Sequence, residues 1–76
     1  MTLKEYLDVT FYDGLWTIYQ KDTNYNCYKS YEKVVENHVD NKKDREILYS
    51  LCGQYLNKEV LRVNVFPYSI VICVKQ

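Results

Sequence analysis

Two β-strand patterns meet at a proline in the stretch Val60-Leu61-Arg62-Val63-Asn64-Val65-Phe66-Pro67-Tyr68-Ser69-Ile70-Val71-Ile72-Cys73-Val74. In residues 60–66, Leu61, Val63 and Val65 alternate with Arg62 and Asn64, which predicts a strand with one apolar face. Pro67 cannot donate to a strand ladder and ends this run. Residues 68–74 form a second strand pattern, apolar on both sides from Ile70 to Val74. Such a strand either lies centrally in its own sheet or pairs with a second copy across a two-fold axis, which would make a homodimer through Ile70–Val74.

A helical pattern precedes these strands at residues 44–56. Its apolar residues recur at helical spacing, namely Ile47, Leu48, Leu51, Cys52, Tyr55 and Leu56. Asp44 and Glu46 near its start suit the helix dipole. Gly53 falls inside the pattern, and we expect it there because the helix packs closely against the sheet.

A short helix is predicted over residues 2–8. Thr2 and Glu5 have the spacing of a capping box, in which each side chain accepts a hydrogen bond from the other residue's backbone N–H. Leu3, Tyr6 and Leu7 then share one helical face.

Residues 9–31 admit two interpretations. In the first, 9–12 and 15–19 are strands joined by a type I′ turn at Asp13-Gly14. In the second, Asp13-Gly14 is a loop into a strand at 15–20, which turns at 21–24 and pairs with 25–29. Both turns can coexist; we favour the second hairpin because it is longer. Ser30 would then cap a helix over 31–39, in which Val34, Val35 and His38 lie near one face.

Together these elements predict one α+β domain spanning residues 1–76, in the order α-β-β-α-α-β-β. The simplest architecture is a small antiparallel sheet of about four strands, with two to three helices mostly on one face.

Residues suited to catalysis or metal binding are few and scattered, so we expect neither an enzyme nor a cofactor. A Cys–His nucleophile pair would need His38, the single histidine, beside Cys27 or Cys52, and no local motif supports it. The two glycines lie far apart and form no phosphate-binding loop. Asp40 and Asp44 are the nearest approach to a metal-binding cluster, and lysines lie between them.

Aromatic residues favour a binding function instead. Nine tyrosines exceed what one small core can hide, and tyrosine is enriched at protein interfaces. The candidate contact residues come from the most aromatic part of the chain: Trp16, Tyr19, Tyr25, Tyr28, Lys29 and Tyr31. Because the net charge is zero, we rank a protein partner above a nucleic acid. The alternative is a nucleic-acid-binding protein that stacks bases on aromatic rings and contacts phosphates through Lys21, Lys29 and Lys33.

The setting that the sequence favours is the cytoplasm. The first residues are charged and lack the apolar run of a signal peptide. Three widely spaced cysteines do not form a disulfide framework.

Three segments resemble short accessory proteins carried by phages and prophages of gut bacteria. Residues 2–8 resemble their opening "(T)LKEYLD", and residues 16–22 are similar to their "xTVYDKD" strand and turn. The helical segment 44–52, followed by the apolar runs at 61–63 and 70–74, resembles their C-terminal half. The resemblance implies an anti-CRISPR-like inhibitor that binds a host defence protein or ribonucleoprotein, without catalysis, in the bacterial host cell.

Overall fold

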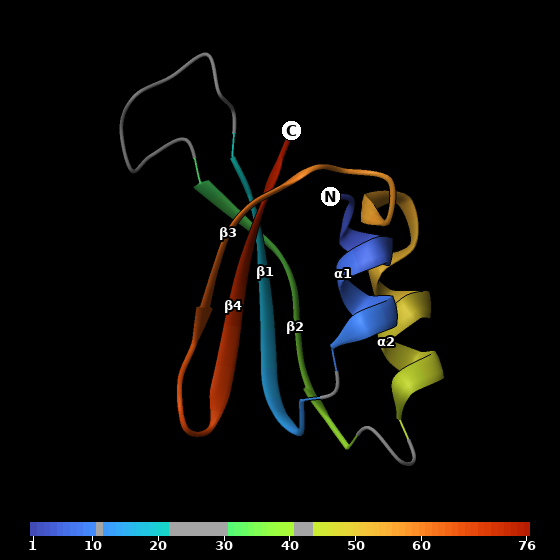
Figure 1. The fold of residues 1–76 in the computed structure, drawn as a ribbon, viewed down its shortest axis with the longest axis vertical. Helices are drawn as coiled ribbons and strands as arrows, with labels where there is room; N and C mark the ends of the chain where they lie inside the picture. The colour runs from blue at the N-terminus through green and yellow to red at the C-terminus, as the bar shows by residue number, and fades with distance from the viewer. Residues whose placement is uncertain (11, 22–30, 41–43) are drawn as a thin grey trace.

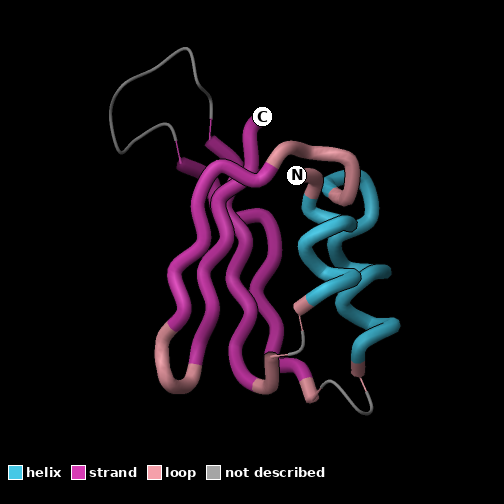
Figure 2. The backbone as a smooth tube through the Cα atoms, in the orientation of Figure 1, coloured by secondary structure: helices cyan, strands magenta, loops and turns pink. Residues whose placement is uncertain are grey.

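The computed structural model describes residues 1–10, 12–21, 31–40 and 44–76. Their helices and strands follow in the order α1 (Leu3–Val9), β1 (Gly14–Lys21), β2 (Tyr31–Val39), α2 (Arg45–Cys52), the 3-10 turn η2 (Gly53–Tyr55), β3 (Val60–Val65) and β4 (Ser69–Lys75). The four strands form one sheet in the order β2-β1-β4-β3. Both α-helices lie on the same side of it (Figures 1 and 2). The α+β class predicted from the sequence is therefore confirmed.

The sheet is mixed, so the prediction of an antiparallel sheet is wrong for its central pair. β1 pairs antiparallel with β2, and β3 pairs antiparallel with β4, but β1 and β4 run parallel. β4 thus has a neighbouring strand on both edges, which explains why it is apolar on both sides. Because both edges are occupied from Ile70 to Val74, backbone pairing with a second copy is not open to this strand.

The hydrophobic core lies between the sheet and the helices. Its sheet side contains Trp16, Ile18, Val35, Val39, Ile70, Ile72 and Val74, and its helix side contains Leu3, Leu7, Leu48 and Cys52. Burial of these apolar side chains is the main force that holds helices and sheet together. No helix among the described residues is long and apolar enough to cross a membrane.

Residues 31–39 form a strand, so the helix predicted there is wrong. The reason is a bulge: Val35 pairs with Ile18 and Lys33 pairs with Tyr19, which leaves Val34 without an opposite residue. Because of the bulge, the adjacent residues Val34 and Val35 both pack at the core. Together with Val39, four residues after Val35, they have the spacing of an apolar helical face. The predicted turn at 22–24, the strand at 25–29 and the Ser30 cap lie outside the described residues.

The stretch around Asp13-Gly14 follows the second of the two interpretations. α1 continues to Val9, Tyr12 is not in a strand, and Gly14 begins β1. There is accordingly no hairpin turn at Asp13-Gly14. The predicted pairing of this strand with residues 25–29 is wrong, because β1 pairs with β2 (residues 31–39) on one edge and with β4 on the other.

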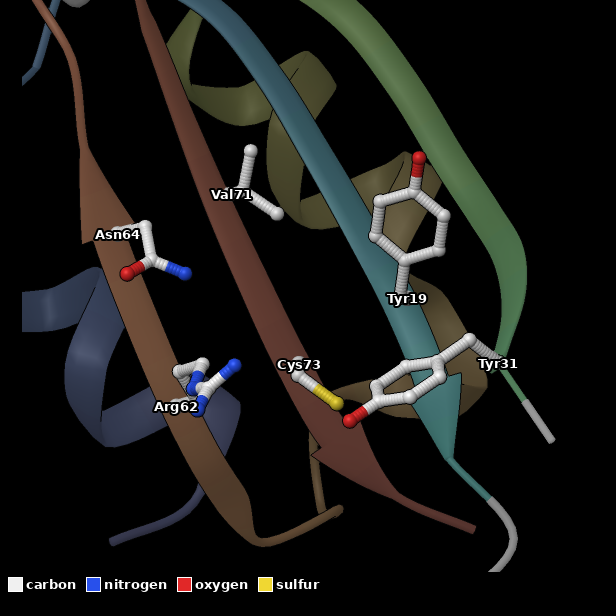
Figure 3. A pocket seen from close by; sticks show the side chains of 6 residues that line it. All are labelled: Tyr19, Tyr31, Arg62, Asn64, Val71 and Cys73. Carbon is white, nitrogen blue, oxygen red and sulfur yellow. The ribbon is translucent and has the colours of Figure 1, made fainter. Parts of the chain in front are cut away.

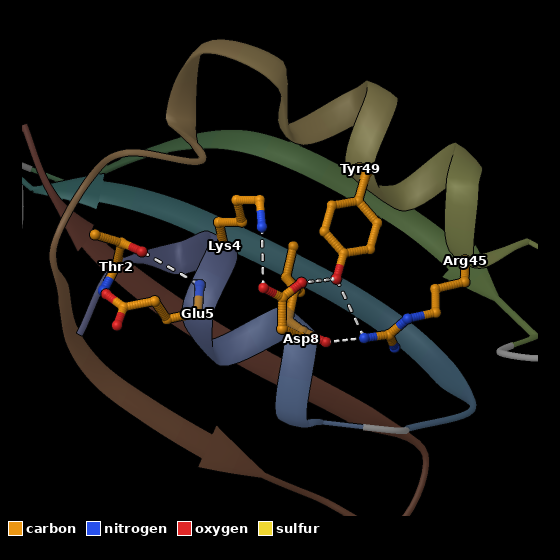
Figure 4. Close-up of polar contacts among 7 residues, drawn as sticks. Thr2, Lys4, Glu5, Asp8, Arg45 and Tyr49 are labelled. Atoms are coloured by element: carbon orange, nitrogen blue, oxygen red, sulfur yellow. Dashed lines mark hydrogen bonds and ion pairs between the residues drawn. The ribbon is translucent and has the colours of Figure 1, made fainter.

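The predicted capping box is present at the start of α1. Thr2 Oγ1 accepts from the Glu5 N–H at 3.2 Å, and Glu5 Oε1 accepts from the Thr2 N–H at 2.9 Å (Figure 4). The backbone on either side is tied to the start of β3 and the residues before it, since Leu3 N–H donates to the Lys58 carbonyl and Val60 N–H to the Met1 carbonyl.

Polar side chains clamp α1 to α2. The Tyr49 hydroxyl donates to Asp8 Oδ1 at 2.5 Å, and Lys4 forms an ion pair with the same carboxylate at 3.0 Å (Figure 4). The Arg45 guanidinium donates to the carbonyls of Leu7 and Thr10. These carbonyls are at the C-terminal end of α1, where a helix leaves its last acceptors unsatisfied. Arg45 therefore caps one helix from the first turn of the other.

Gly53 ends α2, and its predicted close approach to the sheet is wrong. A Cβ built at Gly53 meets nothing within 4 Å, but the residue has φ +30°. The glycine is needed for its backbone conformation at the helix end. The apolar helical pattern predicted over 44–56 is thus divided between α2 and η2.

Candidate binding surface

The side of the sheet that faces away from the helices is the candidate site, which we call the open face. Strand register assigns to it Leu15, Thr17, Tyr19, Lys21, Tyr31, Lys33, Glu36, His38, Arg62, Asn64, Ser69, Val71, Cys73 and Lys75. None of the described helices covers it; they lie behind the sheet in Figure 3.

A shallow depression of about 200 Å³ lies on this face. Residues from all four strands line it: Tyr19, Tyr31, Arg62, Asn64, Val71 and Cys73. In Figure 3 the Tyr31 side chain reaches across β1 toward Cys73, and the Tyr19 ring stands beside it. Tyr31 is 40% exposed, whereas Cys73 on the floor is 6% exposed. The depression therefore has an apolar floor and accessible aromatic rings.

Positive charge surrounds the depression. Among the described residues that strand register assigns to the open face, Lys21, Lys33, Arg62 and Lys75 are cations and Glu36 is the one with a carboxylate. That carboxylate pairs with Lys33 at 2.9 Å. No carboxylate among the described residues forms an ion pair with the other three cations.

Arg62 lines the depression, and Lys21 lies beside one of its aromatic rings. The Lys21 Nζ is 5.3 Å from the centroid of the Tyr31 ring, within range of a cation–π interaction. Burial raises the pKa of the Cys73 thiol, and the nearby charges of Lys21 and Arg62 act in the opposite direction. Both cations thus exert their field on the floor of the depression.

The structure brings together two of the predicted contact residues, Tyr19 and Tyr31. It places Trp16 elsewhere: the indole is fully buried on the helix side, and its Nε1–H donates to the Tyr12 carbonyl at 2.9 Å. Trp16 consequently has no side-chain surface left for a partner. Tyr25, Tyr28 and Lys29 lie outside the described residues.

The C-terminal hairpin supplies the residues that the sequence prediction missed. Arg62, Asn64, Val71 and Cys73 complete the depression. The signal was present in the sequence, because Arg62 and Asn64 are the polar half of an alternating strand. What was lacking was the parallel pairing of β1 with β4, which sets that half beside Tyr19.

Of the residues considered for catalysis, His38 and Cys52 do not come together. His38 belongs to the open face, whereas Cys52 lies in the core on the other side of the sheet. Burial raises the pKa of the Cys52 thiol to about 11, so the thiol stays protonated at neutral pH. The Asp44 carboxylate accepts from the Asp40 N–H at 3.3 Å, which is a local contact at the start of α2. Cys27 lies outside the described residues.

A second exposed feature is the turn between β3 and β4. Tyr68 is 87% exposed there, and Phe66 is also exposed. The turn is held in place, because the Tyr12 hydroxyl donates to the Phe66 carbonyl at 2.7 Å and Leu15 N–H donates to the Tyr68 carbonyl at 3.1 Å. Tyr68 does not line the depression, so it serves below as a matched control for Tyr31.

Comparison with known proteins gives no significant match to a protein-family model, a curated protein or a solved structure.

Proposed function

We propose that this protein is a non-catalytic binding protein and that the open face is its contact surface. The observation that carries the proposal is the division of the sheet into two unlike sides. One side is buried under α1 and α2. The other presents tyrosine rings around a depression, with three cations that form no ion pair with a carboxylate of the described residues.

The composition of this face suits a macromolecular interface. Tyrosine and arginine are the residue types most enriched among those that dominate binding energy, and here Tyr19, Tyr31 and Arg62 line one depression. The depression, at about 200 Å³, is smaller than the usual range of roughly 300–1,000 Å³ for small-molecule sites. An extended partner that covers the whole face fits it better than an enclosed small ligand.

The finer form of the proposal concerns the partner. On the resemblance to phage and prophage accessory proteins, the partner is a defence protein or ribonucleoprotein of the bacterial host cell. Binding would inhibit that complex in an anti-CRISPR-like manner. This form rests on analogy of sequence segments, whereas the choice of the open face rests on geometry.

The test compares two double variants as baits in a bacterial lysate. Tyr31→Ala with Arg62→Glu removes a ring and reverses a charge on the open face. The matched control, Tyr68→Ala with Lys58→Glu, makes the same changes at the β3–β4 turn and on the helix side of the sheet. Wild type and control should retain one defined complex that the open-face variant loses, with circular dichroism confirming that all three are folded. Retention of the same complex by the open-face variant would overturn the proposal.

A second candidate function, nucleic-acid binding, is favoured by the charge on the open face. The sequence argument against it was the zero net charge of the chain. That argument applies to the chain as a whole, whereas a partner meets one surface. On the open face the cations outnumber the carboxylate, so the objection does not hold at this site.

A further inference from the structure

We infer that the open face binds single-stranded nucleic acid, with a base stacked on Tyr31 and phosphates at Lys21 and Arg62. The inference rests on the proposed function, because it uses the same contact surface. It goes further by naming the ligand: an unpaired strand, either free or exposed in a ribonucleoprotein.

Charge complementarity is the first argument. Lys33 is neutralised by Glu36, which leaves Lys21, Arg62 and Lys75 on the face without a carboxylate among the described residues. Lys21 and Lys75 are opposite each other on the parallel strands β1 and β4, and Arg62 lies one strand further on. A backbone that crosses the sheet would meet these cations in turn. Phosphates that bind them release condensed counterions, and this release drives sequence-independent binding.

The aromatic rings are the second argument. Tyr19 and Tyr31 come from neighbouring strands and line the same depression. The Tyr31 ring is exposed enough for a base to stack on it. The Lys21 Nζ is 5.3 Å from the centroid of that ring, so a stacking surface and a phosphate partner are supplied by adjacent side chains. Asn64 adds an amide at the edge of the depression that can hydrogen-bond to a base edge.

The shape of the face selects an unpaired strand over a duplex. In a duplex the base faces are stacked on one another and are not available to side chains of a flat sheet. Open sheet faces that carry aromatic residues bind splayed single-strand bases by stacking. Both described α-helices lie on the other side of the sheet, so neither is placed to enter a groove from the open face (Figures 1 and 2).

Fluorescence anisotropy with labelled oligo(dT) of about 15 nucleotides, within the range that a single small domain contacts, tests the inference. Wild type should bind at low salt, and the same strand annealed to its complement should bind more weakly. Tyr31→Ala should weaken binding about tenfold, the loss expected for one stacked base. Tyr31→Phe keeps the ring and should retain binding, and Tyr68→Ala should bind like wild type.

The salt dependence provides a second and independent readout. The slope of log affinity against log salt should fall in magnitude by about 0.7 in Arg62→Gln, because one phosphate contact is lost. Lys58→Gln, which removes a charge on the helix side, should leave the slope unchanged. This readout stands even where Tyr31→Ala reduces folding.

Three results would overturn the inference: no salt-dependent binding of oligo(dT) by wild type, equal affinity for the duplex, or equal losses in Tyr31→Ala and Tyr68→Ala. The proposed function can survive any of these. If wild type does not bind oligo(dT) but the open-face double variant still loses its complex from the lysate, the contact surface is correct and only the single-stranded ligand is wrong. Where the complex is retained as well, both proposals fail.

Discussion

Gly14 shows how a single residue joins two distant parts of the fold. Its φ is +147°, and a Cβ at this position would come within 2.9 Å of the Tyr12 ring and of the Tyr68 carbonyl oxygen. Tyr12 and Tyr68 also hold the β3–β4 turn against the start of β1. The absence of a side chain at Gly14 is therefore what allows the two hairpins to meet at this end of the sheet.

Replacing Gly14 with alanine should lower the free energy of unfolding by about 1–3 kcal/mol, because the backbone strain is joined by a clash with a carbonyl oxygen. Gly53→Ala is the matched control, since its φ is also positive but nothing lies within 4 Å of the added Cβ. Its loss comes from backbone strain alone and should be smaller. Urea denaturation measures both. Equal losses in the two variants would mean that the contact with Tyr68 does not constrain the junction.

Trp16 shows why the pattern of single residues predicts the candidate site only in part. In β1, Trp16 and Ile18 point to one side, and Leu15, Thr17 and Tyr19 point to the other. Each side carries one aromatic ring and at least one aliphatic residue, so alternation alone does not tell which side is the core. The helices decide it, because they cover the side with Trp16 and leave Tyr19 on the open face.

Among the elements, the two outer strands explain the main errors of the sequence prediction. Each contains an irregularity: Val34 is extra in β2, and Leu61 is skipped in β3, where Val60 pairs with Val74 and Arg62 with Cys73. In β3 the prediction aligned Leu61 with Val63 and Val65, yet Val60 and Val63 pack at the core and Leu61 is exposed. A bulge shifts the alternation by one residue. Strand patterns read from sequence assume no such shift, whereas the capping box of α1 is local and was predicted correctly.

The clamp between α1 and α2 predicts a pH-dependent contribution to stability. The hydrogen bond from Tyr49, followed by that from Lys4, lowers the pKa of the Asp8 carboxyl below its usual value of 3.8. A carboxyl whose pKa is lowered by folding stabilises the protein at pH above its unfolded pKa. This contribution is lost as the pH falls through the folded pKa.

Tyr49→Phe should therefore lower Tm by roughly a few degrees at neutral pH, and the difference from wild type should narrow as the pH falls from about 5 to about 2. Thermal unfolding followed by circular dichroism at several pH values measures it. Tyr6→Phe is the control, because the Tyr6 hydroxyl has no hydrogen bond within the described part of the chain. A constant difference across the pH range would show that the Asp8 carboxylate does not carry the clamp.

For the whole molecule, the parallel contact between β1 and β4 produces the candidate site, and it is what the sequence could least predict. It brings together residues far apart along the chain, such as Lys21 and Lys75, which are opposite in the register. Local patterns identify the hairpin of β3 and β4, but they identify neither the partner of β1 within its hairpin nor how the two hairpins join. The same contact separates charge, because it gathers cations on the open face of a chain whose net charge is zero.

This gathering of like charges should be unfavourable for folding in the absence of a ligand. Lys21, Arg62 and Lys75 approach one another only when the sheet forms, and none has a carboxylate partner among the described residues. Arg62→Gln should therefore raise the free energy of unfolding at low ionic strength by a few tenths of a kcal/mol, roughly the size of other exposed charge interactions. The gain should shrink between about 10 mM and about 300 mM salt, as the screening length falls from about 30 Å to about 6 Å.

Lys4→Gln is the opposite control, because Lys4 has a carboxylate partner in Asp8 at 3.0 Å and its loss should lower Tm at low salt. Thermal unfolding of wild type and both variants across the salt range distinguishes the two cases. A loss of stability in Arg62→Gln like that in Lys4→Gln would mean that Arg62 contributes to the fold. If Arg62→Gln instead gains stability and binds oligo(dT) more weakly, Arg62 destabilises the fold and contributes to ligand binding. A loss of stability in exchange for function is the trade-off expected of a binding site.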